Sequence, residues 1–167
     1  MKNKQNILII NTGGTFNKQY NELNGNLIIK KSNDCIKDIL FQSKITNVNI
    51  KGILYKDSLE ITDEDRELLV KFIKKSKYKK ILIIHGTDTM DKTAIYLADN
   101  IKDKEIVLTG AMVPYSINKV EATSNLMLGY GYLLSNTKNN VYISMHGMVK
   151  KYDKIKKNRE LGVFECR

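Results

Sequence analysis

Short apolar runs alternate with longer segments of helical pattern along this chain. Five runs rich in Ile and Val do not alternate cleanly with polar residues: Ile7–Ile10, Val48–Tyr55, Ile81–Ile84, Ile106–Thr109 and Val141–Met145. Runs of this kind are typical of parallel strands that are covered on both faces. The pattern therefore predicts five buried strands.

Four segments between these runs have apolar residues at helical spacing: Asp34–Ser43, Thr62–Ser76, Thr89–Ile101 and Val120–Leu134. The second begins with Thr62, a good N-cap residue, and continues with three acidic residues that suit the positive end of a helix. Strand and helix alternation of this kind predicts an α/β fold. We expect a flavodoxin-like, doubly wound and mainly parallel five-stranded sheet with helices on both faces.

The length and composition fit one globular domain over residues 1–167, at 42% hydrophobic and 28% charged residues. The net charge of +10 invites a nucleic-acid hypothesis, but 25 of the 28 cations are Lys and only three are Arg. Specific phosphate recognition favours the Arg fork, so we expect no nucleic-acid partner. No apolar run approaches the roughly 18 residues of a membrane helix, and none is long enough for a signal peptide, so we expect no membrane contact and a cytoplasmic protein.

Metal chemistry has little support in the sequence. Cys35 and Cys166 stand far apart and there are two His residues, so no zinc-type spacing occurs and we expect both thiols to be reduced. We expect no metal and no organic cofactor.

Ligands of open parallel sheets bind at the carboxyl ends of the strands. Four unusual stretches follow the first four predicted strands: Thr12-Gly13-Gly14-Thr15, Asp57-Ser58, His85-Gly86-Thr87-Asp88-Thr89-Met90 and Thr109-Gly110-Ala111-Met112. Each stretch alone has an ordinary explanation as a turn, a helix cap or a strand exit. The third gathers hydroxyls and a carboxylate at a helix N-terminus, which a cap does not require; a lone His85 is assigned no chemistry.

Together with Ser124-Asn125-Leu126, these stretches resemble the bacterial-type L-asparaginases, also called the asparaginase/glutaminase family, and they occur in the family's order over nearly the whole chain. The resemblance implies an amidohydrolase that converts L-asparagine to L-aspartate and ammonia through a Thr nucleophile and an acyl-enzyme. It also implies a small-molecule substrate and a homo-oligomer. A free Thr hydroxyl is a weak nucleophile and needs a base or a hydrogen-bond relay.

The resemblance implies catalytic roles residue by residue. Thr15 matches the nucleophile, Thr87 the second catalytic Thr, and Tyr20 the Tyr of the mobile loop, whereas Thr12 matches a structural position. The family also has a Lys beyond the fifth strand, and Lys157 is its match here; Ile155-Lys156-Lys157 lacks the Thr that usually precedes it, so Lys154 and Lys156 stay open as alternatives.

The resemblance also implies the substrate contacts. Asp88 matches the carboxylate that holds the α-ammonium group, Ser58 the residue that holds the α-carboxylate, and Ala111 the position whose carbonyl contacts the side-chain amide. The expected substrate-binding set is completed by Asp57, Gly14 and Gly86.

Some features depart from the family. The chain covers only the N-terminal domain, and the usual C-terminal domain, which completes a neighbour's site, is absent; we expect a complete short form, because the chain begins with Met and the domain looks whole. Val113 stands in place of the family Arg, and Glu121-Ala122-Thr123-Ser124 in place of Asp-Gly-Pro. The alternative is a non-catalytic relic of the domain that senses an amino acid or binds a partner. A glutaminase, or an amidase on a larger acceptor, also stays open.

Overall fold

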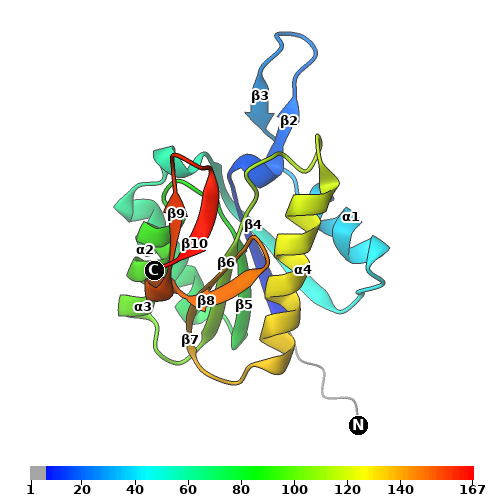
Figure 1. The fold of residues 1–167 in the computed structure, drawn as a ribbon. Coiled ribbons are helices and arrows are strands. Elements are labelled where there is room, and N and C mark those ends of the chain that lie inside the picture. The colour runs from blue at the N-terminus through cyan, green and yellow to red at the C-terminus, as the bar shows by residue number, and fades with distance from the viewer. Residues whose placement is uncertain (1–6) are drawn as a thin grey trace.

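A six-stranded sheet forms the centre of the computed structural model, which describes residues 7–167; residues 1–6 of the expected domain lie outside the described part. Its strands are β1 (Ile7–Gly13), β4 (Val48–Lys56), β5 (Lys80–Ile84), β6 (Glu105–Thr109), β7 (Asn140–Met145) and β8 (Met148–Lys151). They lie side by side in the order β4-β1-β5-β6-β7-β8 (Figure 1). The first five are parallel, and β8 runs antiparallel to β7.

The order of the five parallel strands is the flavodoxin-like one, because the second strand along the chain lies outside the first and the next three follow on the other side. The mainly parallel, doubly wound fold is therefore confirmed. The expected count of five strands is wrong. β8 is an exposed edge strand of four residues with two lysines, so it lacks the apolar run by which the other strands were found.

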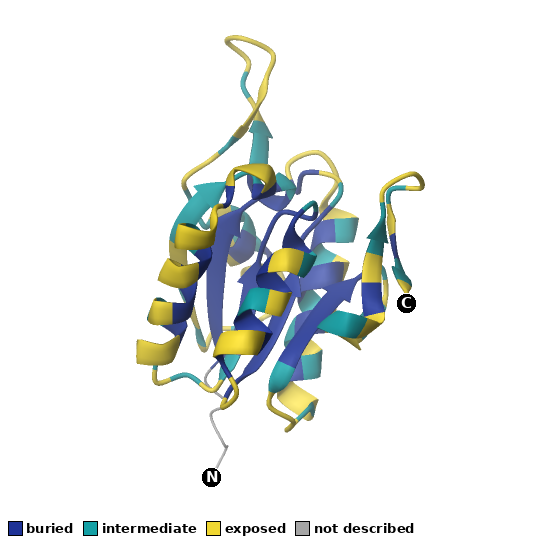
Figure 2. Cartoon of the chain, turned by 90° about the vertical axis from the view of Figure 1, so that its left-hand side faces the viewer, coloured by how far each residue is buried: buried dark blue, intermediate teal, exposed yellow. Residues whose placement is uncertain are grey.

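Four helices cover the two faces of the sheet: α1 (Asp34–Gln42), α2 (Asp63–Lys75), α3 (Met90–Asn100) and α4 (Lys119–Ser135). Each begins and ends within one residue of its expected range. Helices α2 and α3 pack on one face through residues such as Leu69 and Leu97, and α1 and α4 pack on the other through residues such as Ile39 and Leu126. Figure 2 shows β1, β5, β6 and β7 buried between these layers. Fully burying each such side chain contributes about 1.5–3 kcal/mol. The edge strands β4 and β8 have no buried residue, so the expectation that Val48–Tyr55 is a buried strand is wrong.

The start of α2 confirms the cap expected from the sequence. The Thr62 hydroxyl accepts a hydrogen bond from the Asp65 N–H (3.3 Å), and the Asp65 carboxylate accepts one from the Thr62 N–H (3.0 Å). This capping box satisfies two backbone donors that the helix itself leaves without partners.

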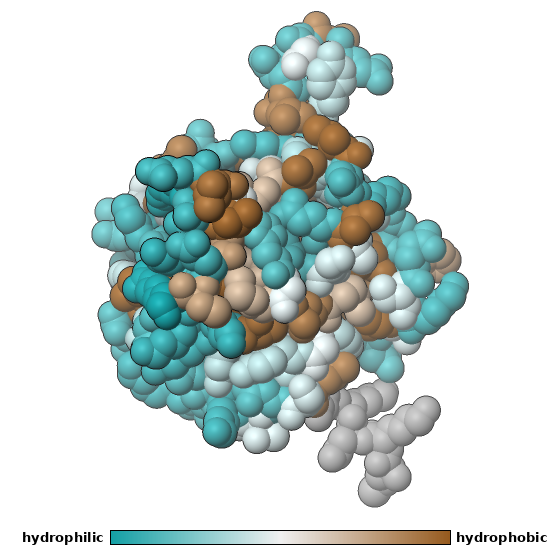
Figure 3. All heavy atoms as spheres, in the orientation of Figure 1, coloured by the Kyte–Doolittle hydropathy of each residue, from teal (hydrophilic) through white to brown (hydrophobic). Residues whose placement is uncertain are grey.

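Two hairpins extend from the carboxyl-terminal side of the sheet. One joins β2 (Lys18–Tyr20) to β3 (Leu27–Ile29), and the other joins β9 (Ile155–Asn158) to β10 (Val163–Cys166). The β2–β3 hairpin projects from the body of the molecule (Figure 1), and Figure 3 shows apolar surface on it, which includes the exposed Leu27 and Ile28.

Within residues 7–167 there are also three short 3-10 turns: η1 (Thr15–Asn17), η2 (Ser58–Glu60) and η3 (Tyr152–Lys154). Among the described residues, no helix has the length and apolar character that crossing a membrane requires.

Candidate active site

Three loops at the carboxyl ends of β1, β4 and β5 approach one another closely at glycine residues. Gly14 has φ 73°, and a Cβ on it would lie 2.4 Å from the Cα of Gly86. A Cβ on Gly86 would lie 2.6 Å from the Cβ of Ser58. Only glycine allows backbones to approach this closely. Because Thr15 follows one of these glycines and Thr87 follows the other, the contact brings both threonines to the same edge of the sheet.

Lys157 joins the third of these loops from a distant part of the chain. Its Nζ donates hydrogen bonds to the Thr87 Oγ1 (2.9 Å) and to the Asp88 Oδ1 (2.7 Å). The Lys157 side chain is 12% exposed and Thr87 is 5% exposed, so water has little access to this contact. Since the Thr87 oxygen accepts from the ammonium group, its own proton is left to donate to a further group.

The other two lysines considered for this position lie elsewhere. The Nζ of Lys156 pairs with Glu165 at 3.2 Å, as expected for a neighbour on a strand whose side chain alternates to the opposite face. Lys154 ends η3 and is exposed.

Arg159 is a site residue that sequence reasoning missed. Its Nη1 donates to the Asp88 Oδ1 (3.2 Å) and its Nη2 donates to the Asp88 backbone carbonyl (2.8 Å). Arg159 lies in the turn that directly follows β9, two residues after Lys157. Strand alternation therefore gives no signal for it, and only its nearness to Lys157 in the sequence could have suggested it.

Ser58 is hydrogen-bonded to the loop that carries Asp88. It is 1% exposed, its Oγ accepts a hydrogen bond from the Asp88 N–H (3.2 Å), and its carbonyl accepts one from the Thr89 hydroxyl (2.7 Å). Because the Ser58 hydroxyl accepts here, its proton remains for an anionic group. Its neighbour Asp57 is an N-cap whose Oδ1 accepts from the Leu59 N–H (3.2 Å).

Asp57 also forms an ion pair with Lys18, at 2.8 Å. Partial burial acts to raise the pKa of Asp57, but the Lys18 hydrogen bond and the backbone N–H groups outweigh burial and lower the pKa below its ordinary value. Both carboxylate oxygens of Asp57 therefore have partners within the chain, at the base of the β2–β3 hairpin.

Thr15 and Tyr20 lie on the segment that leads into this hairpin. Thr15 opens η1 and is half-buried, and among residues 7–167 its hydroxyl makes no hydrogen bond. Tyr20 is 61% exposed, and its hydroxyl lies 3.7 Å from where a Cβ on Gly25 would stand, within the hairpin itself. No hydrogen bond joins Tyr20 to Thr87 in the described part of the chain. Thr12 donates to the Ile84 carbonyl at 2.8 Å and is fully buried, which ties β1 to β5.

The loop after β6 brings Ala111 to the same edge, where it is fully buried. The Glu121 carboxylate accepts hydrogen bonds from the N–H groups of Met112 (2.8 Å) and Val113 (3.0 Å). The side chain of Asn125 donates to the Gly110 carbonyl at 3.0 Å. The first turns of α4 therefore fix the backbone of this loop.

The contacts of the His85 side chain give it a structural role. Its Nδ1 lies 2.7 Å from the Gly86 carbonyl, which can only accept, so we assign the ring proton to Nδ1. The Nε2 lies 2.9 Å from the Thr93 hydroxyl, which in turn accepts from the Arg66 Nε at 3.1 Å. Burial lowers the pKa of His85 to about 4, so the ring is neutral at pH 7.

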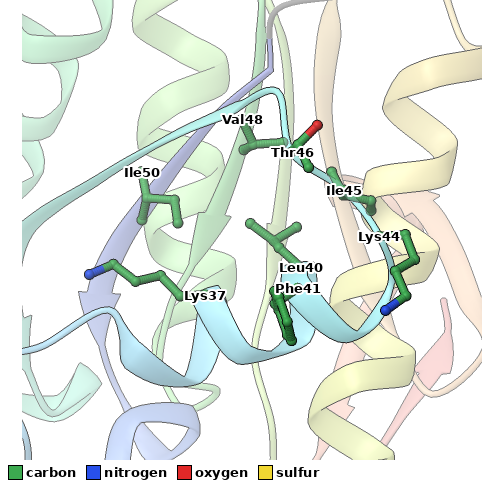
Figure 4. A pocket seen from close by; sticks show the side chains of 8 residues that line it. All are labelled: Lys37, Leu40, Phe41, Lys44, Ile45, Thr46, Val48 and Ile50. Carbon is green, nitrogen blue, oxygen red and sulfur yellow. The ribbon is translucent and has the colours of Figure 1, made fainter.

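The apolar pocket in Figure 4 lies away from this cluster. It has a volume of about 440 Å³ and lies between the C-terminal end of α1 and the beginning of β4, the opposite edge of the sheet. Its lining is Lys37, Leu40, Phe41, Lys44, Ile45, Thr46, Val48 and Ile50, and it includes none of the expected site residues. Within the described residues, no group of three His, Cys, Asp or Glu side chains is placed to hold a metal ion.

Comparison with known proteins connects this arrangement to a family. The model of the asparaginase N-terminal domain matches residues 6–163. The chain is 29% identical over 146 residues to a glutaminase-asparaginase of Acinetobacter glutaminasificans, which covers 82% of this chain and 44% of that protein. It is also 29% identical over 139 residues to L-asparaginase 2 of Bacillus subtilis, which covers 75% of this chain and 36% of that protein.

Solved structures agree with this result. The thermostable L-asparaginase of Thermococcus kodakarensis superimposes with a TM-score of 0.82 at 25% identity, over 96% of this chain and 51% of that one. A probable cytoplasmic L-asparaginase of Campylobacter jejuni does so with a TM-score of 0.80 at 26% identity, over 97% and 53%. The chain thus spans about half the length of these relatives or less. From the family model, which matches nearly every described residue, the chain belongs to the asparaginase family.

Proposed function

We propose that this chain is an amidohydrolase that converts L-asparagine to L-aspartate and ammonia. The observation that carries the proposal is the hydrogen-bonded group of Lys157, Thr87 and Asp88, at 2.9 Å and 2.7 Å, at the carboxyl edge of the sheet. If these residues served only to cap α3, the cap would need no lysine from β9, and that lysine would not need to be almost completely buried.

The reaction begins with Thr15 as the nucleophile. Its Oγ forms a bond to the amide carbon, the C–N bond breaks, and the hydroxyl proton passes to the leaving nitrogen, which departs as ammonia. Water then adds to the acyl-enzyme and restores the hydroxyl. The Lys157–Thr87 hydrogen bond offers the path for these protons, in the manner of a general acid and base. Tyr20 belongs to this proposal as a residue that closes over the site when the β2–β3 hairpin bends.

The remaining site residues hold the substrate. Asp88 accepts the α-ammonium group, and the Ser58 hydroxyl donates to the α-carboxylate. The backbone around Gly14 and Gly86 supplies N–H donors for the oxyanion, and the Ala111 carbonyl accepts from the amide. Donors fixed in this way stabilise charge as it develops in the transition state. Neither a metal nor an organic cofactor enters this scheme.

The same proposal includes a homo-oligomer in the cytoplasm. The exposed apolar residues of the β2–β3 hairpin support an oligomer, because a partner subunit would cover them. The second candidate is a non-catalytic domain that binds an amino acid. It is supported by the hydroxyl of Thr15, which makes no hydrogen bond within residues 7–167 and so has no relay in this conformation.

Ammonia release from L-asparagine and from L-glutamine tests the proposal, with the unaltered chain beside Thr15→Ala and Thr137→Ala. Thr137 is exposed in the loop before β7, so its variant controls for the loss of a hydroxyl. We expect release by the unaltered chain and by Thr137→Ala, and none above background by Thr15→Ala. Binding of L-asparagine without turnover would favour the second candidate.

A further inference from the structure

The strand β4 forms one edge of the central sheet. Within residues 7–167 it pairs only with β1, and the backbone of Val48–Gly52 makes no hydrogen bond to any other described segment. Successive residues of a strand turn their N–H and C=O groups to opposite sides, so an edge strand presents a row of unpaired donors and acceptors. A further strand could therefore pair with β4 on its outer side.

Two apolar pockets flank the same part of this edge, one on each face of the sheet. The first pocket is the one of about 440 Å³ on the α1 side, where Val48 and Ile50 face Leu40 (Figure 4). The second pocket, of about 340 Å³, lies on the α2 side, and its lining includes Leu8, Asn49, Lys51, Phe72 and Tyr78. Residues 48 and 50 thus line the first pocket, and residues 49 and 51 line the second.

A strand added beside β4 would have the same alternation. It would lie about 4.8 Å beyond β4, and its consecutive side chains would point to opposite faces of the sheet. One residue of the added strand would therefore reach the first pocket and the next residue would reach the second. Because both pockets are apolar, the matching segment has two consecutive apolar residues.

Lysines surround both pockets, and no carboxylate lines either one. Among the described residues, only one of the five lining lysines lies within 4.0 Å of a carboxylate: Lys37 beside Asp34, while Lys44, Lys51, Lys75 and Lys77 form no ion pair. The other carboxylates of α1 and α2 are either paired or lie in the first turn of α2, at the far end of that helix from the second pocket: Asp38, Asp63, Glu64, Asp65 and Glu67.

This charge distinguishes between possible occupants of the edge. Lysines commonly protect an edge strand from pairing with another copy, and a second copy of this chain would bring the same lysines to the contact. Protection alone would not need an apolar pocket on each face. An acidic segment with apolar residues complements both the charge and the pockets.

We propose that the β4 edge binds an extended segment of a partner protein, in which two consecutive apolar residues are flanked by acidic residues. Main-chain hydrogen bonds to Val48–Gly52 contribute affinity, and the two pockets fix the register of the added strand. The surface lies at the amino ends of the strands, away from the candidate active site. Because binding requires no turnover, its test does not depend on the proposed hydrolysis.

The probe is a fluorescein-labelled peptide, Glu-Glu-Ile-Phe-Glu-Glu, and its binding is measured by fluorescence anisotropy. We expect a Kd below about 1 mM that rises with salt. Two comparison peptides carry Ser-Ser in place of Ile-Phe, or Gln in place of every Glu, and each should bind about fivefold more weakly or worse. Equal binding of either comparison peptide, or a Kd of the probe above about 1 mM, overturns the proposal.

Two protein variants test the surface itself, each with a matched control. Lys51→Gln is compared with Lys150→Gln, because Lys150 is exposed on β8, the opposite edge strand of the sheet. Phe41→Ser is compared with Leu134→Ser, which alters an exposed apolar residue of α4. We expect Kd to rise about twofold to fivefold in Lys51→Gln and about fivefold or more in Phe41→Ser, with both controls unchanged. Equal values in a variant and its control overturn the proposal.

N-methylated probes test the strand pairing. One peptide carries methyl groups on its first, third and fifth backbone nitrogens, and the other on its second, fourth and sixth. In an added strand, only one of these two sets of N–H groups faces β4. One peptide should therefore lose binding while the other keeps it, and equal effects of the two methylation patterns would overturn the added strand.

Discussion

Lowering the pH from 7 to 5 should destabilise this protein through His85. Burial lowers the pKa of His85 from 6.5 to about 4, so the unfolded chain takes up a proton in a pH range where the folded one does not. Stability is therefore present above pH 6.5 and is lost as the pH falls towards 4. The full difference corresponds to about 3 kcal/mol, and about 2 kcal/mol of it is lost by pH 5.

Denaturant unfolding at pH 7 and pH 5 measures this loss, with His85→Asn as the non-titrating comparison. The loss of unfolding free energy between the two pH values should be about 2 kcal/mol smaller in the variant than in the unaltered chain. Burial raises the pKa of Glu105, which acts with the opposite sign, but Glu105 is present in both proteins and cancels in the comparison. If both proteins lose the same free energy, His85 does not titrate as argued; His85→Gln repeats the test should the Asn variant fail to fold.

Three further substitutions test the packing around the site. Gly14→Ala would place a methyl group 2.4 Å from the Gly86 Cα at a φ of 73°, so we expect a lower Tm and loss of ammonia release; an unchanged Tm would contradict the close approach. Thr12→Val leaves the buried Ile84 carbonyl without that donor and should lower the free energy of unfolding by about 1–3 kcal/mol, and no measurable loss in urea would refute the tie between β1 and β5. Thr62→Ala removes a capping side chain and should lower the free energy of unfolding by about 1 kcal/mol in the same assay. An unchanged free energy of unfolding would show that the cap does not stabilise α2.

The sheet and its four helices could be predicted because their signals are local and strong. Runs such as Ile81–Ile84 are continuous and buried on both faces, and helices such as α2 carry both an apolar stripe and a cap. The strands that were missed are short and lie at the surface, for example β8 and β9 with two lysines each. Each pairs with a neighbour in the sequence, β8 with β7 and β9 with β10, but four residues or fewer are too few to show a periodic pattern.

The candidate site also has a part that could be predicted from the sequence and a part that could not. The loops after β1, β4 and β5 could be placed together from strand order alone, because parallel strands bring their carboxyl ends to one edge. The position of Lys157 beside Thr87 depends on the return of the β9–β10 hairpin over that edge, which no local pattern encodes; only the resemblance suggested it. Arg159 was missed because its partner, Asp88, is 71 residues away in the sequence.

The central claim is that Lys157, through Thr87 and Asp88, drives amide hydrolysis in this chain. It is tested most directly by the kcat for ammonia release from L-asparagine in Lys157→Met and, as a matched control, in Lys156→Met, whose side chain lies on the opposite face of β9. We expect Lys157→Met to lower kcat by about 10²- to 10⁴-fold, the usual contribution of an acid–base group, and Lys156→Met to leave it near the unaltered value. Equal kcat values in the two variants would contradict the account.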